Sequence, residues 1–460
     1  MSPTFRALHV RNFRVYAAGA IVSNIGTWMQ RVAQDWLVLQ LTSSGTALGI
    51  TTGLQFLPAL LLSPVAGVVA DRFPKRTVLR CTQVAMAIPA AILGVLAITG
   101  AVEVWHVYLL AFVFGVGTAF DAPARQSFVV EMVGPEDLSN AVGLNSASFN
   151  SARMVGPALA GLLIAAGGSG VEATGWVILA NAVSYLAVIA SLQKLDPARL
   201  APAPVMGSRK GAVRDGVRYV RSRPDLVLVL TIVFAVGTFG LNFQMTSALM
   251  ATDVFEKGAG EYGILGSIMA IGSLAGALLA ARRERPRLRF VVGAAIAFGV
   301  VEIVAGLMPG YLSYALVLPV LGLCALTMIT AANATIQITT EPVMRGRVAA
   351  LYLMIFMGGT PLGSPFIGWV GETFGARWTL VGGGALSLVG VALALLWYAH
   401  RRQIDRQELH AIATRLRSQH GRRAHLPPAA AGRGGLRLPQ RLREHRALGP
   451  RHDRDDAPVG

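Results

Sequence analysis

The 460-residue chain is poor in charge: only 14% of its residues are Asp, Glu, Lys or Arg, whereas 53% are hydrophobic. A soluble domain carries about 25% charged residues, so the composition argues against a soluble protein. Only two cysteines occur, Cys81 and Cys324, and the eight histidines have no metal-ligand spacing. We therefore expect no disulfide framework and no metal site.

Motifs that carry chemistry are scarce as well. The chain lacks the Gly-x4-Gly-Lys-Ser/Thr sequence that cradles ATP phosphates. No His/Asp/Ser or metal-binding constellation falls within its apolar segments. We expect neither a cofactor nor an enzymatic activity.

What the sequence does have is a series of apolar runs of about 20 residues, the length of helix that crosses a bilayer core. Backbone groups in lipid must be satisfied within their own segment, so these runs predict helices. They do not alternate as the strands of a membrane β-barrel would. We predict an all-α membrane protein with twelve transmembrane helices. The runs lie at 15–39, 47–70, 78–99, 107–130, 138–166, 176–192, 226–250, 262–281, 290–308, 312–338, 348–370 and 380–397.

Basic residues gather in every second loop between these runs. Arg6, Arg11 and Arg14 precede the first run, whereas the loop after it reads Leu-Thr-Ser-Ser-Gly at 41–45. Lys and Arg of short loops stay on the cytoplasmic side, so both termini are predicted to be cytoplasmic, in the cell membrane. This placement accounts for the net charge of +17. We expect the lipid bilayer as partner and no nucleic acid, since contact with anionic lipid, or no role, is favoured for the basic tail.

A polar, basic stretch at 193–225 divides the chain. We predict one six-helix bundle at 1–192, a cytoplasmic central loop at 193–225, a second bundle at 226–399 and a disordered basic tail at 400–460. An internal repeat supports the division: the segment 135–161 matches 342–368 without a gap in Pro, Gly and small residues. Parallel repeats of this kind are found in two-halved carriers.

A charged hairpin between the second and third runs is the most informative motif. It contains Gly67, Asp71, Arg72, Lys75 and Arg76. A glycine permits close approach of two helices, an acid at a helix end can pair or cap a neighbouring helix, and basic residues anchor the loop in the inner leaflet. The alternative is a loop that only sets topology.

This hairpin resembles the loop signature of the major facilitator superfamily of transporters, Gly-x-x-x-Asp-Arg-x-x-Lys/Arg-Lys/Arg. The resemblance implies two pseudo-symmetric six-helix bundles, alternating access, a monomer, and a gate latch at this loop. The corresponding position in the second half, Ala280-Ala281-Arg282-Arg283, has no acid.

The first run carries Asn24, Trp28, Arg31 and Asp35, spaced to share one helical face, with Gln34 beside them. A charge at the centre of a membrane helix costs roughly 2.5–3.5 kcal/mol on insertion scales, and Arg31 and Asp35 can offset this cost as an i,i+4 pair. We expect substrate contact or proton coupling here, with Asp35 as the protonatable carboxylate. A structural clamp is the alternative.

The fourth run ends in Asp121-x-Pro-x-Arg125-Gln, again with an acid and a base at i and i+4. Together with Trp28–Gln34 and Arg345-Gly-Arg347, this segment resembles the branch that includes enterobactin exporters and macrolide efflux proteins. Asp121 is a further candidate for proton coupling. The alternative, weighed equally, is that Asp121 and Arg125 support the gate or the fold.

The fifth run contains Gly156, Pro157 and Gly161, similar to the antiporter motif of drug exporters, in which a bend in this helix is associated with export. Arg153 precedes it and is either paired structurally or binds an anionic group. Other candidates are polar or aromatic positions suited to a cavity, and one lone acid in the second half that could titrate: Asn145, Phe149, Asn242, Gln244, Met245 and Glu302.

These features predict a secondary active transporter that exports small amphiphilic molecules, drug-, macrolide- or siderophore-like, by proton antiport. The partners implied are a small-molecule substrate and protons. A proton-coupled importer, or a receptor or scaffold with a carrier fold, remain as alternatives.

Overall fold

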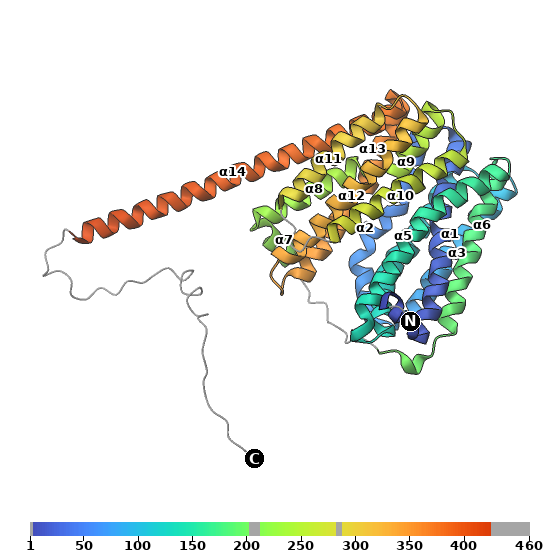
Figure 1. Cartoon of the computed structure of the whole chain (residues 1–460), viewed down its shortest axis with the longest axis horizontal. Helices are drawn as coiled ribbons and strands as arrows, with labels where there is room; N and C mark the ends of the chain where they lie inside the picture. The colour runs from blue at the N-terminus through green and yellow to red at the C-terminus, as the bar shows by residue number, and fades with distance from the viewer. Residues whose placement is uncertain (1–2, 202–211, 282–287, 425–460) are drawn as a thin grey trace, which may run out of the picture. The chain divides into compact units, whose positions relative to one another are not determined.

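The computed structural model describes residues 3–201, 212–281 and 288–424 (Figure 1). The chain forms two units, Met1–Ala399 and His400–Gly460. Every regular element in the described ranges is helical. The elements are η1 (Pro3–His9), α1 (Arg11–Thr42), α2 (Gly45–Arg72), α3 (Lys75–Ile98), α4 (Val104–Met132), α5 (Pro135–Ala166), α6 (Val171–Gln193), η2 (Pro197–Arg199), α7 (Ala212–Arg221), α8 (Pro224–Phe239), α9 (Phe243–Leu249), η3 (Met250–Val254), α10 (Ala259–Ala281), α11 (Leu288–Gly306), α12 (Tyr311–Thr339), α13 (Arg345–Phe374) and α14 (Ala376–Ala424).

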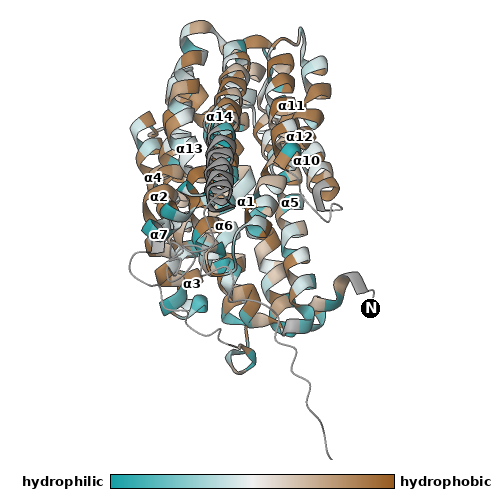
Figure 2. Ribbon diagram, turned by 90° about the vertical axis from the view of Figure 1, so that its left-hand side faces the viewer, coloured by the Kyte–Doolittle hydropathy of each residue, from teal (hydrophilic) through white to brown (hydrophobic). Residues whose placement is uncertain are grey.

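Eleven segments in the described part of the chain are long and apolar enough to cross a membrane. This confirms the predicted all-helical, multi-span membrane protein. The first predicted span, 15–39, lies within the 32-residue α1. It is not among the eleven segments, because its polar residues lower its mean hydropathy. Large apolar side chains are exposed along the helices, among them Trp176, Val183, Leu316 and Leu396, as expected where lipid is the solvent. Figure 2 shows hydrophobic residues recurring along the long helices.

The helices of the first unit form two packed sets. In the first set, α1 lies against α5 and α6, while α4 lies against α2 and α3. In the second set, α12 lies against α10 and α11, and α8 lies against α13. The sets meet where α2 packs on α13 and α5 packs on α10. Both sets therefore belong to the same unit, Met1–Ala399.

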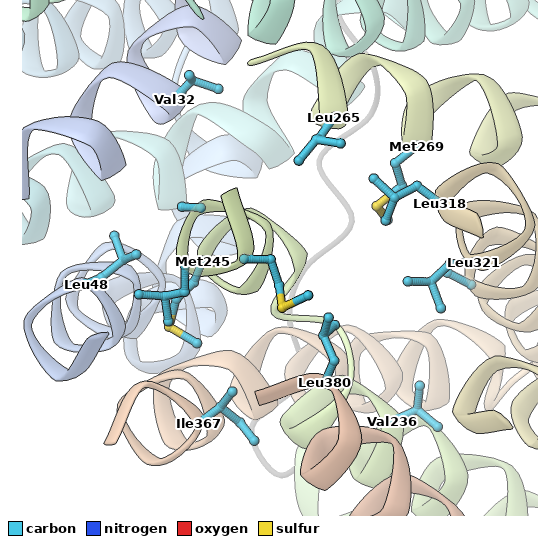
Figure 3. Close-up of a cluster of buried hydrophobic side chains, with 14 of the residues drawn as sticks. Val32, Leu48, Val236, Met245, Leu265, Met269, Leu318, Leu321, Ile367 and Leu380 are labelled. Atoms are coloured by element: carbon cyan, nitrogen blue, oxygen red, sulfur yellow. The ribbon is translucent and has the colours of Figure 1, made fainter. Parts of the chain in front are cut away.

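The sets share one hydrophobic core, and α9 lies within it. Met245 of α9 is only 1% exposed and belongs to the same buried cluster as Leu48 of α2 and Ile367 of α13. Figure 3 shows these side chains around the short helix. The position of α9 thus brings a short helix of the second set up against the first set.

The predicted span 226–250 is not one continuous helix. It consists of α8 and α9, separated at Gly240–Asn242 and followed by the π-helix η3. Gly240 packs against α11, where a Cβ would lie 2.4 Å from the Phe298 ring. The Asn242 side chain donates to the Thr238 carbonyl at 2.9 Å, which satisfies a backbone group freed by the break. Irregular backbone at membrane depth is tolerated where it lies against protein or a cavity.

The last helix is longer than the predicted span 380–397. α14 continues to Ala424, through residues such as Gln, Glu, Leu and Ala that favour helix. The first part of the tail predicted to be disordered, 400–424, is therefore helical. Residues 425–460 of that prediction lie outside the described residues.

Candidate functional site

A cavity of about 400 Å³ lies between the two sets. Its wall includes five residues that the sequence predicted for a cavity: Trp28, Phe149, Asn242, Gln244 and Met245. The predicted cavity residues Asn24, Gln34 and Asn145 do not line it. Gln34 lies on the buried side of α1 and is only 2% exposed. Phe56 of α2, an aromatic residue also expected from the sequence to line a pocket, lies in the wall. The sequence analysis missed Tyr262 and Phe356, which line the wall from α10 and α13, because Tyr and Phe occur in many apolar segments that line no cavity.

Two guanidinium groups converge on one aromatic ring in this wall. The Cζ atom of Arg31 lies 5.0 Å from the ring centroid of Trp28 and 5.2 Å from that of Phe56. The Cζ atom of Arg153 lies 5.6 Å from the Trp28 centroid. Phe149 packs edge-on against Trp28 at 5.8 Å. Cation–π contacts are worth about 0.5–2 kcal/mol each, so the aromatic side chains hold both cations at the cavity.

Asp35 is not paired with Arg31. Among the described residues no ion pair joins these two side chains, and the Tyr262 hydroxyl instead donates to Asp35 Oδ2 at 2.9 Å. Asp35 is 7% exposed and Tyr262 2%. The direct ion pair predicted between Arg31 and Asp35 does not form, because a partner from α10 reaches the carboxylate, although the two charges still attract each other along α1. This hydrogen bond joins α1 of the first set to α10 of the second.

Asp121 does form the predicted pair with Arg125, with an N–O distance of 2.9 Å. Its other oxygen accepts from Thr82 Oγ1 at 2.9 Å and from Gln83 Nε2 at 2.7 Å. The carboxylate is thus enclosed between α3 and α4 and does not line the cavity. Its contacts favour support of the fold over proton coupling.

Glu302 lies on α11 and is fully buried. Neither carboxylate oxygen has a hydrogen-bond partner among the described residues. A Cβ at Gly240 would lie 2.9 Å from Oε2, and one at Gly383 3.3 Å from Oε1. Glu302 therefore sits behind the break between α8 and α9, outside the lining of the cavity.

The predicted bend motif on α5 contacts both α1 and α10. A Cβ at Gly156 would lie 2.6 Å from Trp28 Cβ, and one at Gly161 would lie 2.4 Å from the Ala259 carbonyl oxygen. Pro157 lies inside the helix and lines the cavity. The motif is therefore a contact surface for two neighbouring helices, one from each set.

A serine of α10 inserts into α5 beside Pro157. The Ser267 hydroxyl donates to the Met154 carbonyl and accepts from the Ala158 N–H at 3.2 Å. These two backbone groups would bond to each other in a regular helix, and such insertions are a known cause of helix bends. No pattern in the sequence indicates this role of Ser267, because it depends on a helix more than a hundred positions away.

The charged hairpin does not form a latch in this structure. A Cβ at Gly67 would meet no atom within 4 Å, and Asp71 makes no ion pair with any described residue. The helix after the hairpin has no side-chain cap. Lys75 instead pairs with Glu131 of α4 at 2.8 Å, and Arg76 donates to the Leu192 carbonyl at 2.7 Å. Both contacts stay within the first set, so Lys75 and Arg76 fix the hairpin to its own set.

The two sets are tied together at the opposite end, where α1 turns into α2. Glu372 of α13 accepts from Ser44 Oγ at 2.6 Å and from the Thr46 N–H at 3.0 Å. A Cβ at Gly368 would lie 2.3 Å from the Gly45 carbonyl oxygen. We call this the far end, and the end with the α2–α3 turn the hairpin end. The helix pairs that join the sets are therefore in backbone contact at the far end.

Comparison with known proteins agrees with this architecture. A family model described as transmembrane secretion effector matches residues 2–419. The multidrug efflux pump Tap of Mycolicibacterium fortuitum is 29% identical over 387 residues, 82% of this chain and 92% of its own length. Macrolide efflux protein A of Streptococcus pyogenes is 21% identical, covering 82% and 94%. The enterobactin exporter EntS of Shigella boydii is 24% identical, covering 87% and 93%.

The fold is likewise that of a solved transporter. The crystal structure of a bacterial homologue of the human lysosomal transporter Spinster aligns with a TM-score of 0.66 at 16% identity, covering 86% of this chain and 97% of that one. Together with the family match over most of the chain, this confirms the resemblance carried by the hairpin and the Asp121 segment. The chain belongs to the transmembrane secretion effector family of the major facilitator superfamily, a family of multi-pass membrane transporters that includes efflux pumps.

Proposed function

We propose that the protein is a proton-driven exporter of small amphiphilic molecules that works by alternating access. The observation that carries the proposal is the cavity of about 400 Å³ whose wall is built from both sets of helices. Ligand cavities of a few hundred Å³ suit small molecules. Because its wall comes from both sets, rocking of one set against the other would open it to opposite faces of the membrane. The efflux relatives support export as the direction.

The proposed topology has twelve spans with both termini in the cytoplasm. α1 is the twelfth span, since it is 32 residues long and packs against α5 and α6. The hairpin end then faces the cytoplasm and the far end faces outward. With the sets joined at the far end, the cavity of this conformation would be accessible from the cytoplasm, as loading of an exporter requires. The latch at Asp71 would form only after the hairpin ends approach. We further propose that the protein acts as a monomer.

Asp35 is the proposed coupling residue. Among the acidic candidates Asp35, Asp121 and Glu302, it is the one whose hydrogen bond spans the two sets, through Tyr262. Loss or gain of a proton at Asp35 would change that bond, and with it the energy difference between conformations. Asp121 and Glu302 lack such a link, because one is enclosed within the first set and the other lies on α11 behind the helix break.

The test uses inside-out membrane vesicles energised by respiration and a panel of fluorescent amphiphilic dyes. We expect dye accumulation that a protonophore abolishes and that Asp35→Asn removes, while Tyr262→Phe slows it. Glu341→Gln, which removes an exposed carboxylate, is the matched control and should transport normally. Accumulation that survives in Asp35→Asn would refute the coupling assignment. Proton-driven release instead of accumulation would favour the importer, and no transport of any compound would favour a receptor or scaffold.

A further inference from the structure

The cavity wall carries two positive charges and no negative one. Arg31 and Arg153 line it, whereas no Asp or Glu does. The nearest acid on α1, Asp35, is bound to Tyr262. Neither guanidinium has an ion-pair partner among the described residues, and Arg31 Nε is buried without a hydrogen-bond acceptor. The wall thus offers one buried, unused hydrogen-bond donor and two guanidinium groups that have no ion-pair partner among the described residues.

Such an arrangement is costly unless a ligand compensates it. An unpaired charge within a membrane protein is destabilising by several kcal/mol, and the aromatic contacts offset only part of that. A guanidinium presents five N–H donors in a planar fork that matches a carboxylate or a related oxyanion. Both forks converge on one ring, that of Trp28, so a single anionic group placed near that ring could meet both arginines.

The opposite wall has different chemistry. It is formed mainly by apolar side chains of the second set, including Leu326, Ile329, Phe356 and Met357. A ligand that fills the cavity would therefore have an anionic end on the side of α1 and α5 and an apolar body on the side of α12 and α13. A purely apolar compound would leave the arginines uncompensated, and a cation would be repelled by them.

We propose that the cavity binds amphiphilic anions, with a carboxylate or related oxyanion held by Arg31 and Arg153. This deepens the proposed function, because it names the chemical class of the substrate. Two sources share that chemistry: free organic acids that enter from the cytoplasm, and the headgroups of anionic lipids that enter from the bilayer.

The experiment measures equilibrium binding to the purified full-length protein in lipid nanodiscs. The probes are pyrenebutyrate, its neutral amide and the corresponding amine, which share one apolar body and differ in charge. We expect the carboxylate to bind roughly tenfold to a hundredfold more tightly than the amide, as for a charge-assisted hydrogen bond. Arg153→Gln and Arg31→Gln should each remove most of that preference and leave amide binding little changed. Arg221→Gln, which removes an exposed arginine, is the matched control.

Two results would overturn the inference: amide or amine binding as tightly as the carboxylate, or arginine variants that lose all three probes equally. If Arg31→Gln does not fold, Arg153→Gln alone decides between these outcomes. Nanodiscs with and without phosphatidylglycerol separate the two sources. Weaker probe binding in the presence of that lipid points to a lipid headgroup as the ligand, and equal probe binding in both kinds of disc points to a free organic acid. The measurement needs no proton gradient. If the carboxylate probe binds but no compound is transported, this inference stands and the proposed export is refuted. If dyes are exported but binding shows no preference for the carboxylate, the proposed export stands and this inference is refuted.

Discussion

The ion pair between Lys75 and Glu131 allows a quantitative test of what the charged hairpin does. Their side chains are only 9% and 7% exposed and lie 2.8 Å apart. Removing one member of such a pair leaves the other charge buried without a partner, which costs about 3–5 kcal/mol. Replacing both members with apolar side chains removes both desolvation penalties and is often neutral or stabilising. The single variants should thus be much less stable than the double variant.

The perturbations are Lys75→Met, Glu131→Met and the two together. We expect each single variant to lose about 3–5 kcal/mol of unfolding free energy and the double variant to recover most of that loss. The assay is denaturant titration of the purified protein in detergent micelles, with transport in inside-out vesicles as a second readout. Arg72→Met in the same hairpin is the control, because its side chain is exposed and makes no ion pair with a described residue.

The reasoning fails if each single variant loses less than about 1 kcal/mol, the value typical of a surface pair. It also fails if the double variant is no more stable than the singles. A double variant that is stable but does not transport would show that this pair serves gating in addition to holding the hairpin on α4.

Two further predictions concern packing. Gly263→Leu should separate α5 from α10, because a Cβ at Gly263 would lie 2.3 Å from the Pro157 carbonyl oxygen. Pulsed electron paramagnetic resonance between spin labels on these two helices should then report a longer distance. The control Gly143→Leu, at a position where a Cβ would meet no atom within 4 Å, should leave that distance unchanged. Glu302→Met should raise the free energy of unfolding by about 1–3 kcal/mol, because it removes a buried polar group that has no hydrogen-bond partner among the described residues. Denaturant titration measures this change, and a variant less stable than the original protein would show that Glu302 does have a stabilising partner.

The sequence predicted well those features that the bilayer itself imposes. A membrane-crossing helix must be apolar over a fixed length, so eleven of the predicted spans correspond to segments that meet this criterion. The exception, α1, carries the predicted polar face, of which Trp28 and Arg31 line the cavity whereas Asn24 and Asp35 do not. Helical spacing predicts which residues share a face, but not which part of that face the cavity reaches.

Features that depend on two distant helices were not predictable in the same way. The Asp35 carboxylate could pair with Arg31 or accept a hydrogen bond from Tyr262. Helical spacing indicates only Arg31, four positions away, whereas the hydrogen-bond donor in the structure is Tyr262, 227 positions away. The break at Gly240 lies in the most apolar of the spans, so the hydropathy of the segment does not indicate it. Its close contact with Phe298 of α11 depends on a distant helix. Gly67 is a third case, because the motif predicted a close helix contact there, whereas a Cβ at this position would meet no atom within 4 Å.

The polar face of α1 has a consequence for biosynthesis. On the proposed twelve-span topology, α1 leaves the ribosome before the other eleven spans, and yet it is the one that is not apolar enough to meet the criterion for a membrane span. Its buried Gln30 accepts a hydrogen bond from Asn181 of α6, a residue made 151 positions later. Tyr262, the hydrogen-bond donor to Asp35, is synthesised 227 positions after it. Stable insertion of α1 would therefore be delayed until its partners emerge, so α1 would have to stay in contact with the insertion machinery while α6 and α10 are synthesised.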